Sequence, residues 1–189
     1  IQQGDLLATL GRLDAGIAMT RKAVALDPLS VMAWRRLAHF YMHAHQFPAA
    51  REAVDRLLQL DPQGDPRSFN AELALLTGRP QAALAASDSG TGDYRFVLIA
   101  MAQHSLGRPA KSQQALDWLV QRRAGALAYQ IAEVHAWRGE KDLAFEWLER
   151  AYRQHDGGLT YLGYDRFLDN LRGDARFRAL LAKLKLPGG

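Results

Sequence analysis

Residues 26–62 read LDPLSVMAWRRLAHFYMHAHQFPAAREAVDRLLQLDP, and the tripeptide Leu-Asp-Pro stands at both ends of the stretch. Its two copies begin at Leu26 and Leu60, which are 34 residues apart. Between them, apolar residues recur at helical spacing over about 31–44 and again over 48–60. Proline donates no backbone hydrogen bond and restricts the residue before it, so each Asp-Pro pair ends a helix. The stretch therefore predicts two helices joined by a tight turn, as one unit of a repeat.

This unit resembles the tetratricopeptide repeat, whose 34 residues form a pair of antiparallel helices. The family's tryptophan, leucine, small residue, tyrosine, alanine and closing proline are matched here by Trp34, Leu37, Ala38, Tyr41, Ala50 and Pro62. The resemblance implies an all-α fold without a sheet. We expect an α-solenoid, a right-handed superhelix of antiparallel helix pairs with about eleven or twelve helices.

Weaker copies of the unit extend over the rest of residues 1–156. We expect a partial unit at 1–30 and full units at about 31–64, 65–92, 93–124 and 125–156. The partial unit at 1–30 carries Gly16 and Ala23 at small contact positions. The unit at 125–156 keeps the family's spacing at Ile131, Ala132, Gly139, Ala144 and Ala151. Turns between paired helices are expected at Gly11, Gln46, Gly78, Gly107 and Gly139.

Residues 157–189 depart from the repeat pattern and are expected to form a helical cap, since a solenoid must cover its last apolar face. Asp174 can cap a helix that runs to about Lys185. One face of that helix carries Phe177, Leu180, Leu181 and Leu184. The last third of the chain also resembles the carboxy-terminal part of bacterial multidomain proteins. In those, such repeats follow a winged-helix domain, a nucleotide cyclase or a protein kinase.

Composition excludes several classes of function. The chain has 189 residues, 48% of them hydrophobic, and no cysteine, so disulfides, thiol catalysis and cysteine zinc sites are absent. Its formal charge is +4, and the charges are dispersed, which does not favour nucleic-acid binding. No apolar run is long enough to span a membrane. The opening IQQGDLL is neither a signal peptide nor a start at methionine, so we expect a fragment or a processed product.

Histidines cluster in the first helix of the clearest unit. His39 and His43 are one helical turn apart and could meet one metal ion. A zinc helix of the HExxH type needs glutamate beside the first histidine, and Phe40 stands there instead. No third ligand is evident nearby. We therefore interpret both as surface or groove histidines, expect no metal, and expect their double alanine variant to keep its melting temperature.

No catalytic residue and no cofactor site emerges from the remaining motifs. The stretch SGTGDYR lacks the third glycine of a dinucleotide fingerprint because Arg95 stands there, and GRPAKS has Ala110 at the essential glycine of a phosphate loop. No serine, histidine and acid can be assigned to a triad. We expect a protein without enzymatic activity.

The resemblance places a partner-binding groove on the first helices of successive units. Its expected residues are Met32, Arg35, His39, Met42, His43, Tyr94, Val97, Met101, His104, Tyr129, Glu133 and Trp137. A less regular unit adds Asp65, Ser68 and Glu72. Methionine and aromatic residues suit peptide or helix recognition. We expect Arg35→Ala and Tyr129→Ala to weaken binding without unfolding the protein.

These observations predict a protein–protein interaction module whose groove binds a peptide, a helix or a neighbouring domain of the same chain. The module would be the regulatory or scaffolding part of a larger bacterial protein. Its expected location is the cytoplasm, or the periplasm if the parent protein is anchored in a membrane. Two alternatives stay open: a metal-dependent hydrolase that uses His39 and His43, and a purely structural oligomerisation array.

Overall fold

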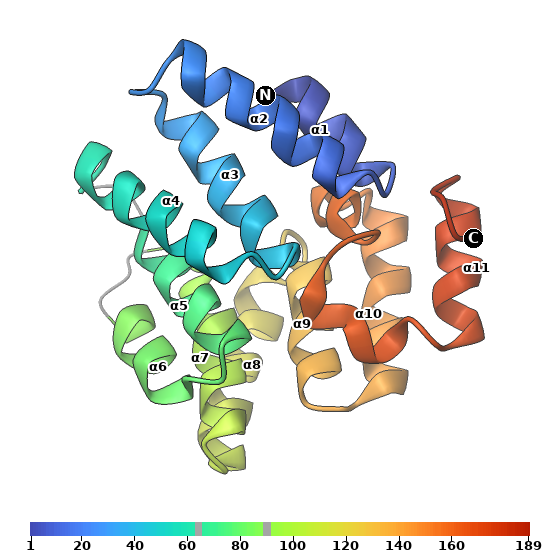
Figure 1. Ribbon diagram of the computed structural model, residues 1–189. Helices are drawn as coiled ribbons and strands as arrows, with labels where there is room; N and C mark the ends of the chain where they lie inside the picture. The colour runs from blue at the N-terminus through green and yellow to red at the C-terminus, as the bar shows by residue number, and fades with distance from the viewer. Residues whose placement is uncertain (63–65, 89–91) are drawn as a thin grey trace.

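The computed structural model describes residues 1–62, 66–88 and 92–189, with Pro66 described by its backbone alone. This part of the chain forms eleven α-helices and two 3-10 helices, and it contains no strand (Figure 1). The first helices are α1 (Gln2–Thr9), α2 (Leu13–Leu26), α3 (Val31–His43), α4 (Phe47–Leu60), α5 (Pro66–Leu76) and α6 (Pro80–Asp88). They are followed by α7 (Arg95–Ser105), α8 (Pro109–Arg123), α9 (Ala128–Trp137), α10 (Lys141–Gln154), η1 (Gly157–Tyr161), η2 (Arg166–Leu171) and α11 (Ala175–Lys183). The all-α prediction is confirmed.

Consecutive helices pack as pairs, and the pairs stack. The pairs are α1 with α2, α3 with α4, α5 with α6, α7 with α8, and α9 with α10. The first helices of neighbouring pairs also contact one another, α3 with α5, α5 with α7 and α7 with α9. These four first helices form one layer, and we call its exposed side the inner face. The division of the chain into units at particular residues stays a prediction.

Local sequence explains where the helices begin. The hydroxyl oxygen of Ser30 accepts a hydrogen bond from the amide of Ala33 and caps α3. Proline stands in the first turn of α4 and α8, where its missing donor costs nothing. The Asp174 carboxylate caps α11 by accepting from the amide of Arg176.

The turns within the pairs share one backbone conformation. Gly11, Gly78, Gly107 and Gly139 all have positive φ, between 68° and 78°. This left-handed conformation favours glycine because no Cβ meets the following carbonyl. The turn before α4 has the same conformation at His45, with a φ of 57°. A histidine therefore replaces the usual glycine there, directly before the predicted turn residue Gln46.

The last helix covers the end of the array. In α11, Phe177, Leu180 and Leu181 are buried against a core that includes Ala144 and Leu148 of α10. Leu184 is half-buried at the end of the same face. The apolar surface of the last pair is thereby removed from water, as a cap requires.

Residues 157–171 take a different course from the one expected of a cap. They lie between α9 and the α1–α2 pair, with η1 beside α1 and η2 along α9 (Figure 1). Tyr164 packs in one core with Ala8 of α1, Ile17 of α2 and Phe40 of α3. The segment thus covers part of the inner face and connects the last pair to the first.

Candidate partner-binding site

Part of the predicted groove is open and forms a pocket on the inner face, with a volume of about 280 Å³. Of the expected groove residues, it is lined by Arg35, His39, Ser68, Glu72, Tyr94 and Glu133. Phe69, Gln130 and Tyr161 complete the lining. The side chains come from α3, α5, the N-terminus of α7, α9 and η1, so the pocket collects residues from four stacked first helices. We call it the inner pocket.

A second hollow adjoins the inner pocket on the side of α3. It has a volume of about 170 Å³ and shares Arg35, His39 and Tyr161 with the inner pocket. Met32, whose side chain is 56% exposed, lines it as well. The two hollows together form a continuous surface with polar and aromatic walls.

Five expected groove residues are buried in the protein interior, which corrects the prediction for their positions. Met42, Val97, Met101 and Tyr129 are fully buried, and His43 is only 2% exposed. The reason for Met42 and Met101 is the stacking of the first helices, which places them in cores with residues of adjacent pairs. Tyr129 and His43 are covered by residues 157–171. These side chains cannot touch a partner in this conformation.

His104 and Trp137 lie away from the inner pocket, and both are half-buried. The indole nitrogen of Trp137 donates a hydrogen bond to the hydroxyl of Ser105, at 2.9 Å. The Trp137 ring packs edge-on against Phe167 of η2, with ring centres 5.5 Å apart. Trp137 therefore contacts the chain's own C-terminal segment. Asp65 lies outside the described residues.

His43 links three elements. Its Nε2 lies 3.1 Å from the Glu72 carboxylate, and its Nδ1 lies 3.1 Å from the backbone nitrogen of Arg166. A backbone N–H can only donate, so Nδ1 is the acceptor and Nε2 carries the proton of the neutral ring. Burial lowers the pKa of His43, and the bond to Glu72 and the charge of Asp165 raise it by more. Protonation would nevertheless place a hydrogen on Nδ1, directly facing the backbone N–H of Arg166. Because two donors then oppose each other, this contact favours the neutral ring.

Tyr129 and Asp165 form a second buried link. The Tyr129 hydroxyl donates to one oxygen of Asp165 at 2.8 Å, and the Phe167 amide donates to the other at 2.8 Å. The Tyr129 amide also donates to the Asp156 carboxylate, at 3.1 Å. Gly158 lies against the Tyr129 ring, where a Cβ would come within 2.6 Å of ring carbons. Removal of the Tyr129 side chain would therefore unfold or loosen this region, contrary to the sequence expectation.

The C-terminal residues that fill the inner face were missed by the sequence reasoning, above all Asp165, Arg166 and Phe167. A signal was present, because Tyr161, Leu162, Tyr164, Phe167, Leu168 and Leu171 form a dense apolar series in a segment that departs from the repeat pattern. Such a series needs burial somewhere. We call the part of the inner face covered by residues 157–171 the filled half, and the part around the inner pocket the open half.

The inner pocket holds polar atoms that the fold does not satisfy. Glu133 Oε2, Gln130 Oε1, His39 Nδ1 and Arg35 Nε are buried without a hydrogen-bond partner among the described residues. Burial, then the charge of Asp165 and a hydrogen bond shared with it, and then the charge of Glu72 hold the pKa of Glu133 well above its usual value. Burial also holds the pKa of His39 well below its usual value, so this ring is neutral at neutral pH.

Glu72 is the third potential metal ligand that the sequence did not reveal. One ligand atom each of His39, His43 and Glu72 lies within 4.8 Å of the others. However, the Arg166 amide occupies the lone pair of His43 Nδ1, so Nε2 can bind a metal only if the ring becomes an anion or that bond breaks. The geometry thus uses His43 as a structural link.

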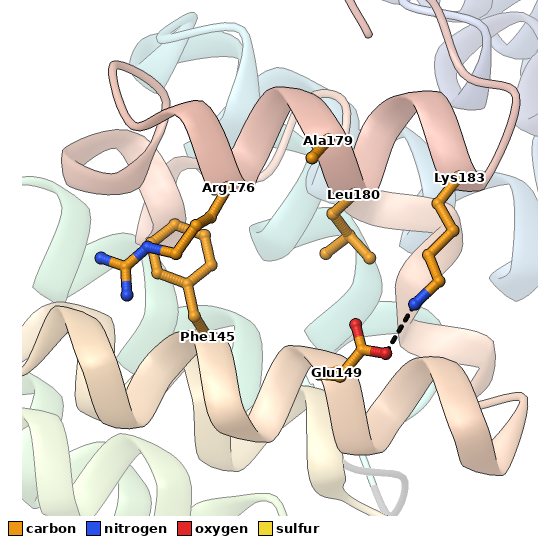
Figure 2. A pocket seen from close by; sticks show the side chains of 6 residues that line it. All are labelled: Phe145, Glu149, Arg176, Ala179, Leu180 and Lys183. Carbon is orange, nitrogen blue, oxygen red and sulfur yellow. Dashed lines mark hydrogen bonds and ion pairs between the residues drawn. The ribbon is translucent and has the colours of Figure 1, made fainter.

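A further hollow, of about 300 Å³, lies between α10 and α11 (Figure 2). Arg176 stacks on the Phe145 ring at 4.2 Å, and Lys183 pairs with Glu149 at 2.5 Å. Arg176 also pairs with Asp142 and Asp174. Since these charges are already paired with one another, the hollow is a seam that joins the cap to the array.

The helix pairs, their stacking and the pocket across their first helices define a helical repeat protein of the solenoid type. The family model for the tetratricopeptide repeat matches residues 1–65 and 97–158, so the chain belongs to the tetratricopeptide repeat family. Proteins of this family are typically interaction modules, and their fold is typically non-catalytic.

The crystal structure of MamA has a similar fold, with a TM-score of 0.52 and 19% sequence identity, over 80% of this chain and 94% of the MamA chain. At this identity the likeness concerns the fold alone. No relative matches among the curated proteins. Within residues 1–62, 66–88 and 92–189, no helix has the length and apolar character needed to cross a membrane.

Proposed function

We propose that this chain is a protein–protein interaction module that binds a protein segment at the open half of its inner face. The observation that carries the proposal is the inner pocket, where Arg35, His39, Tyr94 and Glu133 come together from successive repeats. Polar atoms left without partners in a pocket of this kind are costly unless water or a ligand satisfies them. A peptide backbone and its side chains supply both donors and acceptors.

The size of the open half limits the partner. The inner pocket and the adjoining hollow accept a few side chains of an extended segment or of one helix face. The segment belongs either to a separate protein or to an adjoining domain of a larger bacterial protein, in which this chain is the regulatory or scaffolding part.

The test is selection of a displayed random peptide library against the immobilised protein. Selected peptides are then measured by calorimetry with the wild type, with Arg35→Ala, and with Arg153→Ala as an exposed control on α10. The proposal expects weaker binding to Arg35→Ala alone. Failure to select any peptide, or equal binding to Arg35→Ala and wild type, would place the function elsewhere.

An oligomerisation array is the second candidate, and exposed leucines near the turn between α2 and α3 favour it. Leu26 is 89% exposed and Leu29 is 68% exposed. Large apolar side chains gathered at one end of a molecule often mark an interface. Light scattering of the wild type and of a Leu26→Asp, Leu29→Asp variant distinguishes the two candidates, because only an array held by these residues would dissociate.

A further inference from the structure

The inner pocket is rich in acceptors and poor in donors. Glu133 is 4% exposed, and its Oε2 accepts a hydrogen bond from no N–H or hydroxyl donor among the described residues. Gln130 Oε1, and His39 Nδ1 in one of its two neutral tautomers, add acceptors on the same wall. Glu72, 5% exposed, adds a second carboxylate whose Oε1 is held by His43. A ligand with several N–H donors would satisfy this set.

The positive charges around the pocket have partners other than its carboxylates. Arg36 pairs with Asp5 at 2.6 Å. Arg35 lines the pocket, lies 5.7 Å above the centre of the Phe69 ring and is 3.9 Å from Asp61 at the rim. Arg166 donates to the carbonyl of His43 and pairs with Asp169. His43 is neutral in the observed hydrogen-bond pattern. The carboxyl groups of Glu72, Glu133 and Asp165 therefore lie together on the inner face, and within the described part of the chain no ion pair joins Arg35, Arg36 or Arg166 to any of them.

From this arrangement we infer that the inner pocket receives a basic side chain, lysine or arginine, of the bound protein segment. The inference rests on the proposed function. The ammonium or guanidinium group donates to Oε2 of Glu133 and to Gln130, and Tyr94 and Tyr161 supply aromatic walls. Buried carboxylates make such bonds stronger than they are at an exposed surface.

A metal ion fits the pocket less well than an organic cation. The cluster of ligand atoms within 4.8 Å consists of His39, His43 and Glu72 and does not include Glu133. His43 already uses both of its nitrogens. A guanidinium spreads its donors over several ångströms and can reach acceptors on opposite walls, whereas a zinc ion needs ligands converging at about 2 Å.

The rim favours a side chain of a protein over a free amine. Arg35 Nε is a buried donor that bonds to no acceptor within residues 1–62, 66–88 and 92–189, and it can donate to a backbone carbonyl of a bound segment. The adjoining hollow with Met32 continues the surface beyond the space that one cation fills. A free amine would leave both features unused.

The experiment has two arms. In the first, each peptide selected from the library is resynthesised with citrulline in place of arginine or norleucine in place of lysine, and affinities are measured. In the second, n-butylguanidinium and its neutral analogue n-butylurea are titrated at constant ionic strength and followed by NMR. Both arms use the wild type, Glu133→Gln, and Glu146→Gln, a matched change at an exposed position of α10. Circular dichroism confirms that the variants are folded.

The inference expects selected peptides to carry a basic residue whose neutral replacement weakens binding by about tenfold or more. Glu133→Gln should remove that difference and the binding of butylguanidinium, while Glu146→Gln changes neither.

If the neutral peptides bind the wild type as tightly as the basic ones, the inference of a bound basic side chain is wrong, while the proposed function stands. If no peptide is selected but butylguanidinium binds, the cation is a free amine, and both the protein side chain and the proposed function are wrong. If butylguanidinium does not bind, or binds Glu133→Gln equally, the pocket is not a cation site.

Discussion

The filled and open halves of the inner face use equivalent helix positions in opposite ways. In the filled half, His43 and Tyr129 have their polar atoms matched by Asp165 and Arg166 of the chain's own C-terminal segment. In the open half, on the same two helices, His39 Nδ1 and Glu133 Oε2 receive no hydrogen bond from a donor in the described part of the chain. The residue type therefore does not decide which side chain is available to a partner. A side chain is available only where residues 157–171 do not cover it.

The largest loss of stability should come from Phe167→Ala, which removes a large buried aromatic ring from the filled half. Phe167 is 3% exposed and packs against Trp137 and His43. We expect a loss of about 3–5 kcal/mol in the free energy of unfolding, because a buried aromatic is replaced by a cavity. Urea denaturation measures it, with the half-buried Phe47→Ala as control. A loss no greater than that of the control would mean that the segment does not belong to the folded core.

A comparison of His43→Ala with His39→Ala tests the two halves on one helix. His43→Ala leaves the Glu72 carboxylate and the Arg166 amide without their partner, which should cost about 2–3 kcal/mol of stability. His39→Ala removes no hydrogen bond between described residues, only ring contacts such as those with His43 and Tyr161, and should cost less, about 1 kcal/mol. Thermal melts of both variants measure the difference. Equal melting temperatures of the two variants would contradict it, and melting temperatures equal to that of the wild type would favour the sequence expectation that the double variant is neutral.

In the open half, Arg35→Ala should weaken partner binding and leave folding unchanged. Arg35 lines both hollows, and its ion pair with Asp61 is partly exposed, with a distance of 3.9 Å. Arginine at the centre of an interface commonly contributes about 1–3 kcal/mol. Calorimetry with a selected peptide measures the loss, and the melting temperature serves as the control. A large drop in melting temperature would assign Arg35 to the fold.

The smallest expected effect is a pH dependence that Glu133→Gln abolishes. In the unfolded chain this carboxyl ionises near the ordinary value of 4.5, whereas burial and then Asp165 raise its pKa in the folded protein. The folded state therefore holds its proton more tightly, so stability falls as pH rises from about 4.5 through the folded pKa. Urea titrations across this range should show the variant gaining on the wild type, by on the order of 1 kcal/mol at neutral pH. Parallel curves would argue against the raised pKa.

The fold could be predicted well from the sequence because each unit carries the same helix-packing and turn residues. The spacing of Trp34, Leu37, Ala38 and Tyr41, and glycines at most of the turns, report contacts within one unit or between neighbours. Such contacts join residues that are close in the chain, so periodicity reveals them. The cap helix followed from Asp174 and the apolar face after it for the same reason.

The candidate site was only partly predictable. Helix periodicity places Arg35, His39 and Glu133 on the layer of first helices, and these residues do line the inner pocket. Periodicity says nothing about what covers that layer. The bond from Arg166 to His43 joins residues 123 positions apart, and no local pattern announces it. Burial of Met42 and Met101 likewise depends on how closely neighbouring pairs stack.

The contact of Tyr164 with the α1–α2 pair also bears on how the molecule comes apart. An array whose units touch only their neighbours can fray from either end, one unit at a time. Here Tyr164 shares a core with Ala8 and Ile17, and Gly163 lies near the backbone of Thr9, so the last segment is packed on the first helices. Loss of either terminus exposes the same apolar surface. The two ends should therefore exchange amide protons at similar rates and melt in a single cooperative transition. Folding should be slow, because the C-terminal segment must pack on helices that are far away in the sequence.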